Sequence, residues 1–458
     1  MNENKKTVLF AGVAVALVAL ALIFAPQRIT PDAFLEQGEP FFPEFTDPNE
    51  AITLEVIDFD EATGAARPFK VTFENGRWTI PSHHDYHADG KDRLARTAAG
   101  VIDIKKDDFR SDNVSDHEAC GVIDPLDETA GLTGRGQRVT IKGGNQQVLA
   151  DFIIGLPVEN REGFRFVRVP EQKRVYAVRM DIDISTEFKD WIEADLLQVD
   201  KNKIDRVELR DYSINERTGS VQQRDDLMLN LKNGEWKANK MKSGQQVDSA
   251  KMQTVLTTLD ELAIVGVRPK PEGLSASLKK SSEDKAISQS DVRSLRSKGF
   301  YFTRDGRLLS NEGELQVNTK DGISYTLRFG EVVYGSGLAV TAGVDVDSGE
   351  EQSSAAQNRY LFITTEFDET AFPEPKRPAG TDFLKKPDSL WTDEDRDNKA
   401  LQDTHDRWQR DVENGRRISE ELNARFADWY YVISADSFEK LRLKRQDLVV
   451  KKDEKEED

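Results

Sequence analysis

The chain has 458 residues, of which 37% are hydrophobic and 32% charged, so it is long enough for two folded domains with a very polar remainder. Its formal net charge of −19 argues against nucleic acid and anionic lipid headgroups as partners, because a negative field repels both. Cys120 is the only cysteine, which excludes an intramolecular disulfide and a cysteine-based zinc site.

A long apolar segment lies near the N-terminus. From Val8 to Ala25 every residue is apolar or glycine, and a helix of that length spans roughly 27 Å, enough for a bilayer core. Two lysines precede the segment and a strongly acidic chain follows, which predicts a cytoplasmic N-terminus (1–6), a transmembrane anchor (7–25) and an exported body. A cleaved signal peptide is the alternative, but Pro26 would then directly follow the cut.

These features predict a single-pass protein of the inner (cytoplasmic) membrane with a periplasmic or otherwise extracytoplasmic body. Residues 26–50 follow the anchor and are rich in proline, phenylalanine and acidic residues. We expect them to form an extended tether that holds the body away from the membrane.

Residues 51–200 predict a first α+β unit. Its opening strand alternates Ile52, Leu54 and Val56, and Asn75-Gly76 before Trp78 is a strong hairpin signal because both turn positions accept positive φ. We expect a helix opened by Asp89, with one apolar face. Paired strands and a short terminal helix complete the unit, at 139–141, 148–155, 164–169, 175–178 and 185–191.

Residues 201–445 predict a second α+β unit of the same pattern. Asn233-Gly234 again precedes a tryptophan, Trp236, and Asp248 opens an apolar-faced helix. Further strands and a final helix are expected at 315–317, 325–330, 360–364, 429–433 and 434–441. The recurrence of the hairpin motif in the same context indicates an internal repeat, and the tight turns predict mainly antiparallel sheets.

The second unit carries insertions at about 269–298, 335–358 and 371–428. The first is rich in lysine, serine and glutamate, which predicts a mobile loop. From Trp391 to Asp428 the apolar spacing is helical among many charges, which predicts one or two long surface helices. Large aromatics are unexpected there, so Trp391 and Trp408 are weak candidates for partner contact. Residues 446–458 predict a charged, disordered tail.

The ordered set of motifs resembles a known bacterial family. The set consists of the anchor, Asn75–Trp78, Ala88-Asp89, Gly121–Pro125, Phe152–Gly155, Phe166–Arg168, Val175–Val178 and Trp191 before Leu196-Leu197. It is similar to the domain of unknown function 4340, over most of 52–200 and more weakly over the second unit. The long insertions depart from that family's pattern.

The resemblance implies a membrane-anchored extracytoplasmic protein encoded beside an ABC-transporter ATPase, its permease and a gliding-motility-type auxiliary subunit. On that basis we expect a non-enzymatic accessory or scaffold subunit of such a transport system. The resemblance implies no reaction, no cofactor and no catalytic residues.

The histidine-rich stretch His83-His84-Asp85-Tyr86-His87 supports an alternative. Three imidazoles in such a short span can bind zinc or copper, so these histidines could serve a metal-dependent extracytoplasmic hydrolase. Neighbouring side chains of an extended segment point to opposite faces, however, so we expect a solvated loop with no metal. A stand-alone envelope-binding module is the remaining alternative.

Overall fold

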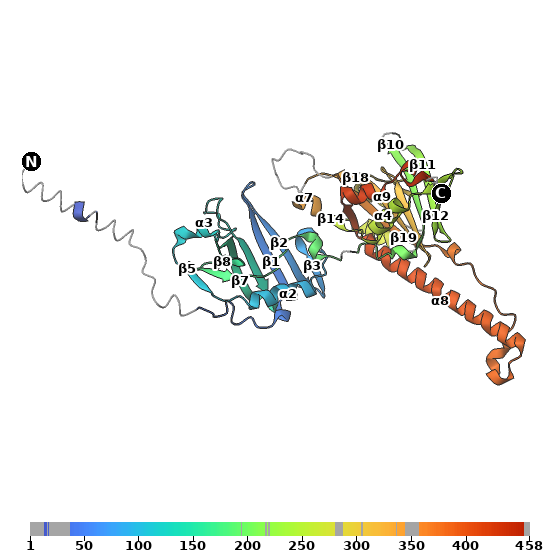
Figure 1. The fold of residues 1–458 in the computed structure, drawn as a ribbon, viewed down its shortest axis with the longest axis horizontal. Coiled ribbons are helices and arrows are strands. Elements are labelled where there is room, and N and C mark those ends of the chain that lie inside the picture. The colour runs from blue at the N-terminus through green and yellow to red at the C-terminus, as the bar shows by residue number, and fades with distance from the viewer. Residues whose placement is uncertain are drawn as a thin grey trace, which may run out of the picture. The chain divides into compact units, whose positions relative to one another are not determined.

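The structure is a computed structural model, shown in Figure 1, and some residues lie outside its described part. The described residues are 13–15, 17, 37–193, 195–215, 218, 220–279, 287–303, 306–335, 337–343 and 357–452. Most of the predicted anchor (7–25) and the final residues 453–458 fall outside these ranges. Within the described ranges, no helix is long and apolar enough to cross a membrane.

The chain divides into two compact units, residues 1–68 with 94–184 and residues 69–93 with 185–458. Both units combine helices with sheets of antiparallel strands, which confirms the predicted α+β class. The domain boundaries expected from the sequence, 51–200 and 201–445, stay predictions.

The first unit is built on one antiparallel sheet. Its strands are β1 (Thr53–Asp60), the beginning of β2 (Ala65–Glu74), β5 (Asp108–Ser111), β6 (Gln137–Lys142), β7 (Val148–Pro157), β8 (Phe164–Arg168) and β9 (Val175–Arg179), in the spatial order β2-β1-β6-β7-β8-β9-β5. Val56 pairs with Val139, and Val139 pairs with Phe152, so alternate apolar residues align across neighbouring strands and are fully buried.

Helix α2 (Lys91–Ile102) buries an apolar stripe, as its sequence predicts, with Leu94, Ala98 and Val101 fully buried. It begins two residues after Asp89, so Gly90 separates the expected cap from the helix. A short helix, α3 (His117–Cys120), precedes β6.

The described part of the predicted tether, residues 37–50, packs on the first unit. Phe41 and Phe45 are 6% and 1% exposed, and the ring of Phe41 lies 5.2 Å from that of Tyr176 in an edge-to-face contact. The Phe41 amide donates to the Ile104 carbonyl at 2.9 Å. The expectation of an extended tether is therefore wrong for this segment, because its phenylalanines bury apolar area against the sheet.

The second unit holds an eight-stranded antiparallel sheet of order β12-β11-β10-β17-β18-β19-β20-β14. Its strands are β10 (Ile204–Asn215), β11 (Ser220–Lys232), β12 (Glu235–Ala238), β14 (Ile264–Pro269), β17 (Glu314–Thr319), β18 (Ile323–Val333), β19 (Asn358–Phe367) and β20 (Trp429–Ile433). Helix α4 (Ser249–Asp260) follows β12 and β13 (Gln245–Val247), and Asp248 caps it as predicted by accepting from the Ala250 and Lys251 amides. The unit also contains a short pair, β15 (Phe300–Phe302) and β16 (Leu308–Ser310), and helices α7 (Gly337–Thr341) and α9 (Ala435–Leu441).

The two sheets share one strand order, although the first sheet has one further strand at its edge. The order β2-β1-β6-β7-β8-β9-β5 in the first sheet matches β11-β10-β17-β18-β19-β20-β14 in the second. The end of β2 forms a hairpin with β3 (Arg77–Ile80), followed by β4 (Tyr86–His87), and β11 forms one with β12.

Both hairpins have the two-residue turns predicted from Asn-Gly. Glu74 pairs with Arg77, and Lys232 pairs with Glu235, which leaves two residues in each turn. The φ angles are 53° and 78° for Asn75 and Gly76, and 53° and 82° for Asn233 and Gly234. Positive φ at both positions matches the twist of the flanking strands.

Two regions of the second unit differ from expectation. The segment 269–298 contains helices α5 (Glu272–Leu278) and α6 (Gln289–Arg296), although 280–286 lie outside the described residues. Their leucines join a buried cluster of Leu274, Leu278, Leu295, Phe300, Phe362, Ala427 and Tyr430, so the predicted mobile loop is wrong for these helices. Residues 445–451 form α10 (Arg445–Leu448) and β21 (Val449–Lys451), which pairs with β13, so the predicted disorder is wrong there.

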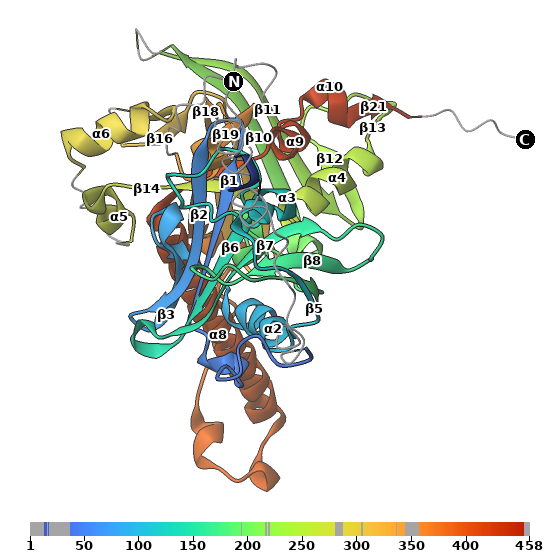
Figure 2. The same cartoon turned by 90° about the vertical axis from the view of Figure 1, so that its left-hand side faces the viewer.

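The predicted long surface helix is one helix of 35 residues, α8 (Asp393–Ala427). Its C-terminal half buries Val412, Leu422 and Phe426 against the unit, and Thr365 of β19 donates a hydrogen bond to the Ser419 carbonyl at 2.8 Å. Its N-terminal half extends away from the strands of the second unit in both views (Figures 1 and 2).

Candidate functional site

A groove of about 590 Å³ lies in the second unit, between strands β10 and β11 and the C-terminal segment 443–449. Its volume is in the range of small-ligand sites. Thirteen residues line it: Leu209, Asp211, Arg224, Asp225, Leu227, Lys240, Lys242, Gln245, Leu443, Lys444, Arg445, Gln446 and Val449. Five of these side chains are cationic and two are carboxylates. The groove is therefore net positive, although the chain as a whole has a net charge of −19.

Arg445 fastens the C-terminal wall of the groove to β11. Its Nε and Nη2 donate to the two carboxylate oxygens of Asp225 at 3.0 and 3.2 Å, and its Nη1 donates to the Asn239 carbonyl at 2.7 Å. Burial raises the pKa of Asp225, but the hydrogen bonds from Arg445 and from the Asp226 amide bring that pKa below its usual value. Asp225 is therefore held ionised as part of a structural ion pair.

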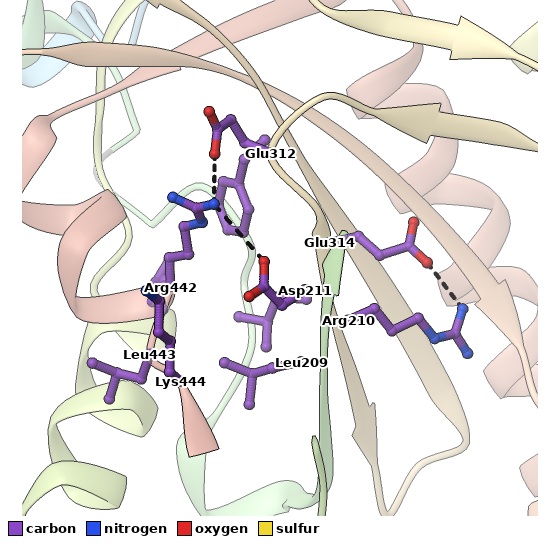
Figure 3. Close-up of a pocket in the computed structure, with 11 residues that line it drawn as sticks. Leu209, Arg210, Asp211, Glu312, Glu314, Arg442, Leu443 and Lys444 are labelled. Carbon is purple, nitrogen blue, oxygen red and sulfur yellow. Dashed lines mark hydrogen bonds and ion pairs between the residues drawn. The ribbon is translucent and has the colours of Figure 1, made fainter. Parts of the chain in front are cut away.

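A smaller pocket of about 20 Å³ lies beside the groove and shares Leu209, Asp211, Leu443 and Lys444 with it (Figure 3). That volume holds about one water molecule. Figure 3 shows Arg442 directed at two carboxylates, with Nη2 2.6 Å from Glu312 and 3.8 Å from Asp211.

A buried ion network lies next to this pocket and is centred on Glu314, whose side chain is 5% exposed. Arg210 approaches Glu314 at 2.9 Å, Arg328 approaches it at 3.3 Å, and the Tyr212 hydroxyl donates to it at 3.2 Å. Burial and the negative charge of Glu314 raise the pKa of Tyr212 to about 12, so the hydroxyl stays protonated and remains a donor. These groups hold strands β10 and β17 together, and two arginines neutralise the Glu314 carboxylate.

A second feature is the arm, which we define as residues 372–411: the N-terminal half of α8 and the strap 372–392 that leads into it. Within α8, only Asp395 is buried between residues 393 and 411. Thr392 and Asp395 form a capping box at the start of the helix, and Lys386 of the strap bonds Asp395 at 3.0 Å. The arm therefore has its own local stabilising contacts.

Trp391 and Trp408, which the sequence predicts as weak candidates for partner contact, form hydrogen bonds within the arm. Trp408 Nε1 donates to the Phe372 carbonyl at 2.8 Å, and Trp391 Nε1 donates to the Phe383 carbonyl at 3.2 Å. Both side chains are half-buried. The strongly exposed apolar residues of the strap are instead Leu384 and Leu390, each 67% exposed.

The histidine-rich stretch places its three imidazoles in different environments. His83 is 2% exposed and stacks on Phe188 with ring centroids 4.3 Å apart, whereas His84 Nε2 lies 2.7 Å from the Ala342 carbonyl. His84 and Asp85 both have positive φ, 58° and 57°, which turns the chain between the histidines. His87, in β4, is exposed. In the described part of the chain, no group of three or more His, Cys, Asp or Glu side chains could hold a metal ion.

Burial lowers the pKa of His83 to about 4, with smaller contributions from the charges of His84 and Arg268. Partial desolvation of its ring also lowers the pKa of His87, although the residue as a whole is exposed. His83 is therefore neutral near pH 7 and fills the role of a core aromatic. Its buried Nε2 has no hydrogen-bond partner among the residues that the structure describes, while its Nδ1 lies 2.9 Å from the Ser82 hydroxyl.

Local sequence patterns do not predict the groove. Its cationic residues come from segments about 200 positions apart, around Lys240 and around Lys444, and no spacing rule connects them. The available signal was the run Lys440-Leu-Arg442-Leu-Lys444-Arg445, a concentration of positive charge in an acidic chain.

Comparison with known proteins gives one match. Residues 78–277 match the family model described as Domain of unknown function (DUF4340). No curated protein and no solved structure matches the chain. The matched segment includes Lys240 and Lys242 of the groove but neither the arm nor the C-terminal wall of the groove.

Proposed function

We propose that this chain, whose residues 78–277 belong to the DUF4340 family, is a non-enzymatic accessory subunit of an ABC-type transport system. In this proposal it is anchored in the cytoplasmic membrane by residues 7–25 and acts outside the cytoplasm as a scaffold. The observation that carries the proposal is the arm, a locally stabilised projection that ends in two exposed leucines.

The arm interrupts a fold that we propose arose by internal duplication. The identical strand order of the two sheets and the two Asn-Gly hairpins support this origin. In the first sheet, β8 and β9 are joined by residues 169–174, whereas β19 and β20 are joined by 368–428. A segment present in only one of two copies is free to take a role that the shared framework does not require.

The chemistry of the strap suits contact with another protein. A single exposed leucine is common on protein surfaces, but Leu384 and Leu390 lie on a strap that hydrogen bonds hold in place. Burying a leucine side chain stabilises a complex by about 1.5–3 kcal/mol. Less ordering entropy is lost when the segment is already fixed before binding, which favours a rigid arm as a docking element.

The groove supports a binding role over acid–base catalysis. Asp211, Asp225 and Glu312 are each paired with an arginine guanidinium. Burial raises the pKa of Asp225, but hydrogen bonds from Arg445 and from the Asp226 amide lower it below its usual value, which makes this carboxylate a weaker general base.

The test is copurification of the tagged, full-length protein from native membranes in mild detergent, followed by mass spectrometry. We expect an ABC ATPase and a permease in fixed ratio with the native protein. The double variant Leu384→Glu and Leu390→Glu should lose them. The matched control, Leu126→Glu and Leu132→Glu, alters leucines that are 50% and 54% exposed elsewhere and should retain both proteins.

Three outcomes count against the proposal. Recovery of the native protein alone would favour a stand-alone envelope-binding module. Stoichiometric zinc in the purified protein, lost on replacement of His83, His84 and His87, would support the metal-dependent hydrolase. If the partners are recovered equally with the Leu384/Leu390 variant, the docking role of the arm is wrong and the contact lies elsewhere.

A further inference from the structure

We propose that the groove between β10–β11 and the C-terminal segment 443–449 binds an acidic peptide segment that carries apolar side chains. This site is separate from the arm, so its test does not depend on the proposed function. Three properties of the groove support the proposal: its uncompensated positive charge, its apolar residues and its polar rim.

The positive charge comes from three lysines. Lys240, Lys242 and Lys444 line the groove and are exposed, and within the described residues none of the three forms an ion pair, although the charge of Lys240 acts on Asp225 at a distance. Lys240 and Lys242 lie after β12, and Lys444 comes from the opposite, C-terminal wall. A ligand in the groove therefore meets ammonium groups on both sides.

The two carboxylates of the groove do not cancel this charge. Asp211 accepts from Arg224 at 2.7 Å, with Arg442 at 3.8 Å, and Asp225 is bound by Arg445 at 3.0 Å. Guanidinium groups thus neutralise both carboxylates before any ligand arrives. A positive groove in a chain of net charge −19 concentrates anions locally, because clefts lined by one sign of charge focus the field.

The remaining lining residues distinguish a peptide from a lipid. Leu209, Leu227, Leu443 and Val449 supply apolar surface, but the other nine lining residues are polar or charged. An acyl chain would desolvate those polar groups without giving them hydrogen-bond partners, which is unfavourable. A peptide backbone offers donors and acceptors of its own, and Gln446 lines the groove to pair with them. Gln245 offers only its side-chain amide nitrogen, because its Oε1 accepts from the Lys242 amide at 2.8 Å.

The test measures binding of a fluorescent hexapeptide of alternating glutamate and leucine by anisotropy, using the full-length protein in detergent. Replacement of the three lysines, Lys240→Gln, Lys242→Gln and Lys444→Gln, should weaken binding at least about tenfold, as expected for the loss of three exposed charge contacts. The same positions changed to arginine should restore it. The control triple Lys91→Gln, Lys173→Gln and Lys189→Gln removes exposed lysines outside the groove and the arm, and it should bind like the native protein.

Peptide variants test each half of the proposal. A glutamine-leucine hexapeptide should bind weakly because it has no side-chain carboxylates, and a glutamate-serine hexapeptide should bind weakly because it lacks apolar side chains. Raising the salt concentration should also weaken binding, since exposed charges are screened. Equal affinity of the groove and control triples would overturn the proposal. Displacement of the peptide by dodecanoate at lower concentration than by unlabelled peptide would overturn it in favour of an anionic amphiphile.

Discussion

The two sheets share one strand order but differ in how they join their corresponding strands. Residues 169–174 connect β8 to β9, while 368–428 connect β19 to β20. The longer connection is not simply an added loop, because the C-terminal half of α8 is part of the buried core of the second unit. The comparison shows that an insertion can add both core and surface: one helix stabilises the sheet with one half and projects from it with the other.

The two halves of α8 are stabilised by different physics. The C-terminal half buries apolar side chains, a contribution proportional to the area removed from water. The N-terminal half depends on its capping box, on hydrogen bonds to the strap and on surface ion pairs, which contribute much less per contact. Stability is therefore expected to fall along the helix from its C-terminal to its N-terminal end.

The largest expected effect comes from a substitution in the buried C-terminal half of α8. Phe426 is fully buried and its ring meets Tyr431 edge to face at 6.2 Å. Phe426→Ala should lower the free energy of unfolding by about 3–5 kcal/mol, because it removes apolar contacts and leaves a cavity. Urea denaturation measures this loss, and a loss below about 1 kcal/mol would show that the α8 core is not packed as described.

The burial of Phe426 also predicts the outcome of deleting residues 391–428. Removing 391–428 would expose the face of β19 that α8 covers and would remove Phe426 and Leu422 from the core. Such a deletion is expected to unfold the second unit, so the tip substitutions Leu384→Glu and Leu390→Glu are the better probe of partner binding.

The next effect is a pH dependence of stability that we expect after the first hairpin and not after the second. The residues after β3 include His83, whose pKa is lowered from 6.5 to about 4, while the residues after β12 include no histidine. Between these two values the unfolded chain binds more protons than the folded chain, so falling pH favours unfolding. The contribution of His83 to stability is fully present above 6.5 and is lost progressively as pH falls toward 4.

At about pH 5 this loss amounts to about 2 kcal/mol, relative to a variant without the imidazole. His83→Phe keeps a ring to stack on Phe188 and removes the titrating group. Urea denaturation of both proteins near pH 7 and near pH 5 isolates the effect as a difference of differences. If the native protein and the variant lose the same stability, then His83 is not buried in its neutral form.

A smaller pair of effects tests the equivalence of the two Asn-Gly turns. Gly76 and Gly234 have φ of 78° and 82°, and a methyl group added to either meets nothing within 4 Å. Each glycine-to-alanine change should therefore lower the free energy of unfolding by about 1 kcal/mol, through backbone strain alone. Equal losses in denaturation experiments would support the repeat, whereas a loss at only one turn would show that the hairpins are not equivalent.

Local patterns in the sequence were sufficient to predict these hairpins, the cap of α4 by Asp248 and the strand pairs β8-β9 and β19-β20. Those features depend on residues close together in the chain, where turn preference and apolar spacing decide the structure. The packing of α5 and α6, the burial of Phe41, and the groove depend on contacts with distant segments. Composition misled the prediction at 269–298, because scattered leucines in a polar segment are enough to anchor two short helices.

The smallest expected effect tests whether the N-terminal half of α8 opens independently of its buried C-terminal half. Trp408→Phe removes the hydrogen bond to the Phe372 carbonyl and keeps an aromatic ring in the arm. Loss of such a bond destabilises by about 1 kcal/mol, so local opening should increase about fivefold, seen as faster amide hydrogen exchange over 393–411. The free energy of global unfolding should stay unchanged, because the arm can open without exposing the core.

Trp191→Phe is the matched control for this substitution, since Trp191 is fully buried and its Nε1 donates to the Ser185 carbonyl at 2.9 Å. That change leaves a core acceptor without its donor, and it should lower the free energy of global unfolding. If Trp408→Phe also lowers it, the arm unfolds together with the sheet. The two halves of α8 would then be one cooperative unit, and a docking element that orders independently of the core would be excluded.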